Sequence, residues 1–166
     1  MAETTSRLAL PLLAAGQAQK EMFHNEALAL IDLALAAAVE SVGLNTPPAT
    51  PEDGQCWIVG TMPIGAWSQQ ANALAGWTAG GWRFVEALIG MRVWSENDGV
   101  FCRYDGSVWQ IGHLAARTLT IGGVQVVGSR QAAIESPTGG SVVDGEARAS
   151  IANILTALRA HGLINS

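Results

Sequence analysis

Residues 27–39 read ALALIDLALAAAV, a segment of helix-forming residues in which Asp32 is the only polar side chain. A helix that is apolar on every side has to be buried on every side. The segment is too short to cross a bilayer, which needs about 20 apolar residues. A chain of 166 residues has little mass with which to enclose such a helix. We therefore expect other copies of the chain, or another protein, to cover it.

The sequence around this segment predicts a long N-terminal apolar helix over residues 17–42, because Gly43 is the residue type that most readily closes a helix. Residues 1–16 then form an N-terminal arm, in which Pro11 disfavours helical geometry for Leu10. Large apolar residues recur along one side of the predicted helix and indicate an oligomer interface. These residues are Leu28, Ile31, Leu35 and Val42.

A proline-rich segment, TPPATPEDG at residues 46–54, separates this helix from a region with a different periodicity. In that region, short runs of β-branched and aromatic residues are separated by turn sequences such as Asp-Gly. We predict an antiparallel meander of about five strands, formed by the runs QCWIVG, GWRFVEAL, RVWSE, VFCRY and SVWQI. The sequence thus predicts the α+β class, with a helix plus tryptophan-rich β domain over residues 17–114.

The rest of the chain, residues 115–166, is expected to form a stem or docking segment. TLTIGGVQVVG predicts two short strands about Gly122 and Gly123, and a final amphipathic helix should begin near Asp144 and end at Gly162. Its aliphatic residues recur at alternating spacings of four and three, as in coiled coils. This seam packs either on the sheet of its own chain or on equivalent helices around a symmetry axis, and its narrowness favours the second arrangement. The predicted interface consists of Ile151, Ile154 and Leu158.

Composition and motifs argue against several classes of function. The net charge is −5, and the nine Lys and Arg residues are scattered, which argues against nucleic acid as a partner. The sequence contains neither HExxH nor GxSxG, and no Gly-rich phosphate loop follows a strand. We therefore assign no catalytic, cofactor-binding or metal-ligating residues, and we expect neither an enzyme nor a membrane-inserted protein. The isolated Cys56 and Cys102 are expected to be buried thiols rather than a disulfide or zinc ligands.

All six tryptophans fall in the middle region of the chain. Trp57, Trp94 and Trp109 lie in predicted strands, where core or cross-strand packing is expected. Aromatic rings beside glycine-rich turns also stack on the apolar faces of sugar rings. A glycan-binding module is therefore the alternative function, with candidate binding residues Trp67, Trp77 and Trp82.

Three stretches of the chain carry a more specific pattern, namely LPLLAAGQAQKEMFHNEAL at 10–28, PPATPEDGQCWIVG at 47–60, and the tryptophan-rich stretch that ends in YDGSVW at 104–109. Together they resemble a domain of unassigned function that is common in alphaproteobacterial prophages and gene transfer agents, where it occurs in tail-fibre and head-spike proteins. The most specific part is AGQAQKEMFHNEAL. The end of the chain, from GVQVVG to AHGLI, is similar to the segment that closes many phage fibre and spike chains.

The resemblance implies a component of a virion-like particle that forms a symmetric homo-oligomer, either a trimer or a pentamer. Such particles assemble in the bacterial cytoplasm and are released on lysis, and the component supports attachment to the host surface, including its polysaccharide. Many fibres continue into a receptor-binding region after this domain, whereas this sequence ends at Ser166. We therefore expect a spike base or adaptor, with a capsid or tail protein and a separate fibre protein as its partners.

Overall fold

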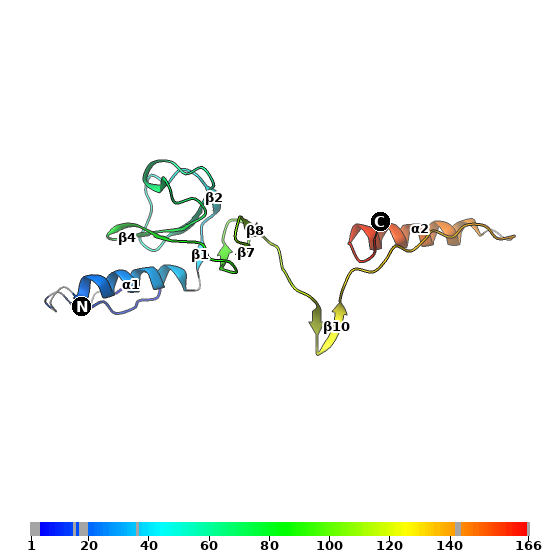
Figure 1. Cartoon of the computed structure of the whole chain (residues 1–166), viewed down its shortest axis with the longest axis horizontal. Helices are drawn as coiled ribbons and strands as arrows, with labels where there is room; N and C mark the ends of the chain where they lie inside the picture. The colour runs from blue at the N-terminus through cyan, green and yellow to red at the C-terminus, as the bar shows by residue number, and fades with distance from the viewer. Residues whose placement is uncertain (1–3, 15, 17–19, 36, 142–143, 166) are drawn as a thin grey trace. The chain divides into compact units, whose positions relative to one another are not determined.

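The computed structural model describes most of the chain, namely residues 4–14, 16, 20–35, 37–141 and 144–165. The chain divides into two compact units, which we call unit 1 (Met1–His113) and unit 2 (Leu114–Ser166). Unit 1 contains the helix α1 (Lys20–Ala34) and two sheets, and unit 2 contains a strand hairpin and the helix α2 (Gly145–Ala160), as Figure 1 shows. The class is α+β, as the sequence predicts.

The predicted long apolar helix over residues 17–42 is wrong. Helix α1 ends at Ala34, and the chain then forms two short strands, β1 (Ala38–Val39) and β2 (Val42–Leu44). The β-branched Val39 and Val42 suit strands, and each of these strands completes a different sheet. The apolar run is therefore covered in part within its own chain, since Leu33, Ala37 and Val39 are buried but Ile31 and Leu35 are exposed. Several positions of the predicted arm and helix lie outside the described residues, namely 1–3, 15, 17–19 and 36.

The first sheet has the order β2-β3-β4-β5, and its three long strands are β3 (Cys56–Val59), β4 (Leu74–Thr78) and β5 (Gly81–Val85). Strand β2 pairs with β3 in parallel, and the other pairs are antiparallel. Helix α1 contacts β4 and β5. At this contact Gly76 lies under Leu33, because a Cβ on Gly76 would come within 2.7 Å of Leu33 Cδ1 and still closer to Cδ2.

The second sheet has the order β1-β6-β7-β8, with the strands β6 (Arg92–Ser95), β7 (Val100–Tyr104) and β8 (Trp109–Ile111). Strand β1 pairs with β6 in parallel. The predicted single meander is therefore replaced by two four-stranded sheets, and β4 lies in a stretch where the sequence predicts no strand. Parallel edge strands are hard to foresee because their partners are distant in sequence.

The two sheets have the same arrangement of one parallel edge strand followed by antiparallel strands, and they pack on a common core. Each ends in a hairpin with an aromatic pair across its strands, Trp77 opposite Trp82 in one and Tyr104 opposite Trp109 in the other. The Trp109 Nε1–H donates a 2.9 Å hydrogen bond to the carbonyl of Asn72 and so links the second sheet to the loop before β4. Residues from α1 and both sheets form the main core, among them Leu33, Val39, Ile58, Leu74, Val93, Cys102 and Trp109.

The turn between β7 and β8 is closed by the carboxylate of Asp105. Its Oδ1 accepts hydrogen bonds from the backbone N–H groups of Ser107 (2.8 Å) and Val108 (2.9 Å). Its Oδ2 accepts one from the side chain of Gln110 (2.7 Å). These bonds, led by that from Val108, lower the pKa of Asp105 to about 2.

We expect the Asp105→Asn variant to fold like wild type but to lose the part of the pH dependence of stability that Asp105 contributes. A carboxyl group with a lowered folded-state pKa stabilises the protein above its unfolded-state pKa of 3.8, and this stabilisation disappears as the pH falls towards about 2. The difference in urea midpoint between wild type and variant should therefore be largest at neutral pH and shrink below about pH 4. Unfolding curves followed by tryptophan fluorescence measure it, and a difference that does not change with pH would contradict the assignment.

Unit 2 begins with an antiparallel hairpin formed by β9 (Leu119–Ile121) and β10 (Val124–Val127). The two turn glycines, Gly122 and Gly123, have positive φ angles of 57° and 82°, which confirms the two predicted strands. The predicted C-terminal helix is also confirmed as α2, since the Asp144 carboxylate accepts a 2.9 Å hydrogen bond from the Ala147 N–H at its start. Residues 142–143 lie outside the described residues.

An extended segment, residues 130–139, follows one face of α2, and we call it the strap. Gln131 forms a β-bridge with Ile164 just beyond the helix. Along the helix, Arg159 donates to the carbonyl of Ile134 (2.7 Å), and Arg148 donates to the carbonyls of Pro137 (2.9 Å) and Gly139. The strap thus covers the face of α2 that carries the arginines.

Candidate functional site

Four tryptophans gather on the face of the first sheet that points away from α1. Trp57, Trp77 and Trp82 come from β3, β4 and β5, and the short 3-10 helix η1 (Gly65–Trp67) adds Trp67. Their ring centroids lie 5.0 to 6.2 Å apart, and most of the pairs meet edge to face. The predicted glycan-binding residues are therefore brought together as one packed cluster.

The burial of this cluster corrects the prediction for Trp67. Its side chain is 0% exposed, because η1 folds the ring over the sheet and against Trp57 and Trp82. A buried ring offers no face to a sugar, so the predicted exposed role of Trp67 is wrong. Trp77 and Trp82 are half-buried at the edge of the cluster, beside Phe84. Core or cross-strand packing is confirmed for the other three tryptophans: Trp57 and Trp109 are buried, and Trp94, which is 38% exposed, packs across the strands on Phe101.

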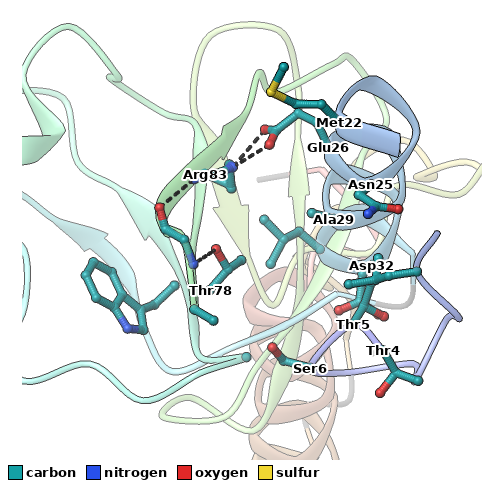
Figure 2. A pocket seen from close by; sticks show the side chains of 16 residues that line it. Thr4, Thr5, Ser6, Met22, Asn25, Glu26, Ala29, Asp32, Thr78 and Arg83 are labelled. Carbon is teal, nitrogen blue, oxygen red and sulfur yellow. Dashed lines mark hydrogen bonds and ion pairs between the residues drawn. The ribbon is translucent and has the colours of Figure 1, made fainter. Parts of the chain in front are cut away.

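A cavity of about 270 Å³ lies beside α1, between the N-terminal arm, the helix and the turn that joins β4 to β5. Figure 2 shows the side chains that line it. The Arg83 Nε–H donates to the Glu26 carboxylate, with a shortest distance of 2.7 Å, and both side chains are partly exposed. The cavity is lined partly by apolar residues, among them Leu12, Met22, Ala29 and Leu33.

The wall of this cavity nearest the arm is built around Asp32. This side chain is 3% exposed, and its carboxylate accepts three hydrogen bonds, from Thr5 Oγ1 (2.8 Å) and from the backbone N–H groups of Arg7 (3.0 Å) and Leu8 (2.7 Å). A buried carboxylate is tolerated when it is hydrogen-bonded in this way. Asp32 therefore fastens the arm to α1.

Asn25, two helical turns before Asp32 on the same side of α1, forms a second such clasp on the arm. The Asn25 Oδ1 accepts a hydrogen bond from the Leu13 N–H (2.9 Å), and its Nδ2 donates one to the Leu13 carbonyl (3.0 Å). Neither clasp is among the features predicted from the sequence. The signal for Asp32 was available, because a lone carboxylate in an apolar run has to find buried donors.

Several polar side chains that line the cavity are engaged in contacts within the protein. Asp32 and Asn25 bind the arm, Glu26 and Arg83 bind each other, and Thr78 Oγ1 donates to the carbonyl of Gly81. Cys56 lies nearby, and its burial raises the pKa of its thiol, as burial also does for Cys102. Both thiols are buried, as the sequence predicts. A raised pKa keeps the thiol protonated and therefore a weak nucleophile.

The predicted oligomer-interface residues fall on both helices, on strand β2 and directly beyond the end of α1. Ile31 on α1 is 49% exposed, Leu35 just after the helix is 58% exposed, and Phe23 on α1 is 78% exposed. Leu28 is half-buried. Val42 lies in β2 and packs against the main core, so its predicted place on a helix seam is wrong. On α2, the predicted row remains uncovered, with Ile151 and Ile154 exposed and Leu158 half-buried.

The outer face of the second sheet carries an aromatic pair across neighbouring strands, which confirms the cross-strand packing expected for Trp94. Trp94 and Phe101 are directly opposite each other on β6 and β7, with ring centroids 5.0 Å apart. Phe101 is 62% exposed. Two register positions away, on the same face, Arg92 is paired with Arg103. Neither arginine forms an ion pair with a residue that the structure describes.

Within the described part of the chain, no group of His, Cys, Asp and Glu side chains is arranged to hold a metal ion. None of its helices combines the length and apolar character needed to span a bilayer.

None of the curated proteins compared with the chain matches it. A family model described as a protein of unknown function (DUF2793) matches residues 24–110, which is more than half of the sequence and covers most of α1 and both sheets of unit 1. The chain therefore belongs to the DUF2793 family.

Proposed function

We propose that the chain is a structural component of a phage-like particle, a spike base or adaptor that is built from several identical copies. The observation that carries this proposal is the lack of a core in unit 2. Among the described residues of this unit, only Leu155 and Ile164 are buried. Many of its large aliphatic residues are exposed instead, and they include Leu114, Leu119, Ile121, Val124, Val126, Ile151 and Ile154.

A segment with this surface needs a partner to be stable. A two-stranded hairpin is marginal in water on its own, and every residue of β9 and β10 is exposed. A single isolated helix is also marginal unless its apolar face is packed. The aliphatic residues of unit 2 therefore favour burial against other molecules, and large exposed apolar patches are typical of interfaces.

The geometry of α2 favours other copies of the chain as the partner. The strap already covers the face with Arg148, Leu155 and Arg159. The neighbouring face carries a heptad-like row formed by Ile151, Ile154 and Leu158. Ile151 and Ile154 in this row are exposed, and Leu158 is half-buried. Identical helices bury such rows by inserting each side chain between four residues of the facing helix. A trimer or a pentamer provides this arrangement.

Unit 1 supplies a separate surface for a different partner. Phe23 and Ile31 are exposed on α1, and Leu35 is exposed directly after the helix ends at Ala34. These apolar side chains suit docking to a capsid or tail protein, while unit 2 holds the copies together and supports a fibre. The assignment to a phage-like particle rests on the sequence stretches that resemble prophage and gene transfer agent proteins, and the same resemblance supports release of the particle on lysis.

The experiment that tests this function measures whether the chain is incorporated into released particles. An epitope-tagged chain is expressed in the cells that encode it, released particles are purified by density gradient, and the tag is detected by immunoblot. We expect wild type in the particle fraction and Ile154→Asp absent from it, because a carboxylate in the centre of the α2 row cannot be buried against identical helices. Asn153→Asp, on an exposed position of the same helix, should remain in the particles. Wild type absent from particles, or Ile154→Asp incorporated as well as wild type, would contradict the proposal.

A further inference from the structure

The outer face of the second sheet is built from two neighbouring rows of side chains, which we call the Trp94–Arg103 face. Successive residues of a strand point to opposite faces, so the buried Val93 and Cys102 place their neighbours outside. The first row runs across β1, β6 and β7, and the second across β6, β7 and β8. The rows are Ala38, Trp94 and Phe101, and then Arg92, Arg103 and Gln110.

The second row violates a rule of sheet stability. Like charges directly opposite each other on neighbouring strands are destabilising, and Arg92 is paired in register with Arg103. The Arg103 Nε atom is buried and has no hydrogen-bond partner among the described residues. The Asp105 carboxylate, whose pKa the charge of Arg103 also lowers, already accepts three hydrogen bonds from its own turn. Local departures of this kind are expected where a site serves function.

The first row adds exposed aromatic surface beside these charges. Trp94 is 38% exposed and Phe101 is 62% exposed. The small Ala38 is the neighbour of Trp94 on β1, so no large side chain shields that flank of the indole. An aromatic ring accepts the apolar C–H face of a sugar ring, and a guanidinium group binds a carboxylate through two parallel hydrogen bonds.

We propose that the Trp94–Arg103 face binds a saccharide whose rings carry carboxylate groups. The sugar ring lies on Trp94, and its carboxylate lies between the guanidinium groups of Arg92 and Arg103. Binding of the anion removes the repulsion between the arginines. This site is in unit 1 and does not depend on the assembly role of unit 2, so the two proposals fail independently.

The test measures binding of the full chain to three soluble probes by calorimetry at about 0.15 M salt, where weak surface charge effects are screened. The probes are an oligogalacturonate, its methyl ester with the same rings but no charge, and an oligoglutamate with the charge but no rings. We expect the oligogalacturonate to bind at least about tenfold more tightly than either of the others, because only it offers both stacking and charge-assisted hydrogen bonds. Equal binding of oligoglutamate would indicate an acidic protein partner and overturn the proposal, as would no binding of any probe.

Variants assign the binding to this face. Arg92→Gln and Arg103→Gln should each weaken oligogalacturonate binding about tenfold, and Arg103→Lys should recover only part of it, because a lysine keeps the charge but not the planar fork. Trp94→Ser should weaken binding similarly, and circular dichroism checks that each variant remains folded. Arg117→Gln, which removes an exposed cation from unit 2, is the matched control and should bind like wild type. Unchanged binding by both folded arginine-to-glutamine variants would overturn the assignment.

Discussion

Gly76→Val is expected to lower the free energy of unfolding of unit 1 by about 3 kcal/mol. The side chain of Leu33 lies where a Cβ on Gly76 would project, and Leu33 is itself 1% exposed in the main core. The strand β4 and the helix α1 cannot move away from each other without opening that core. All six tryptophans lie in unit 1, so urea unfolding followed by tryptophan fluorescence reports on this unit.

Two comparisons make this result specific to the contact. Gly80→Ala, in the turn of the same hairpin, meets only the end of the Arg83 side chain and should cost about 1 kcal/mol or less. Leu33→Ala alone should cost about 2–5 kcal/mol, but the double variant with Gly76→Val should cost less than the sum, since the new side chain fills the space that Leu33 leaves. Additive costs, or a Gly76→Val variant as stable as wild type, would show that α1 does not pack on β4 as described.

Asp32→Ala is expected to cost about 2–4 kcal/mol, because it removes the acceptor of three hydrogen bonds and leaves donors of the arm without partners. The arm should detach while α1 stays folded, since alanine favours helix. Limited proteolysis measures the detachment, with faster cleavage within residues 4–14, and the urea midpoint measures the loss of stability.

Glu26→Gln is the control for this second effect. Glu26 lies on the same helix as Asp32, and the substitution removes its charge from the partly exposed ion pair with Arg83. Such pairs contribute about 1 kcal/mol or less to the free energy of unfolding. The arm should remain protected in this variant. An Asp32→Ala protein whose arm resists proteolysis as well as wild type would show that the buried carboxylate does not hold the arm.

Local signals in the sequence predict much of the fold. Asp144 precedes the start of α2 and Gly162 follows its end, as expected, because a capping carboxylate and a helix-closing glycine act on their immediate neighbours. Gly122 and Gly123 define the β9–β10 hairpin for the same reason. The runs around β3, β5, β6, β7 and β8 are strands, because alternation and β-branched residues reflect the strand itself.

The features that sequence analysis misses depend on distant parts of the chain. An apolar run such as ALALIDLALAAAV fits a buried helix and a buried strand equally well, and only the two sheets decide that the chain leaves the helix after Ala34. Burial of the tryptophans depends on distant partners in the same way. Trp67 is covered because the short helix η1 folds it onto a sheet, and Trp94 stays 38% exposed on the outer face of the second sheet. The site on the second sheet is therefore visible only in the fold.

The most direct test of the account is the native mass of the purified full chain, measured by sedimentation equilibrium at micromolar concentration. The exposed aliphatic rows of unit 2 predict a single assembly whose mass is a whole multiple of 17.3 kDa, with three or five copies, and predict that Ile154→Asp lowers this mass. A stably folded wild-type species of 17.3 kDa, with unit 2 protected from proteolysis, would contradict the claim that this chain completes its structure by binding copies of itself.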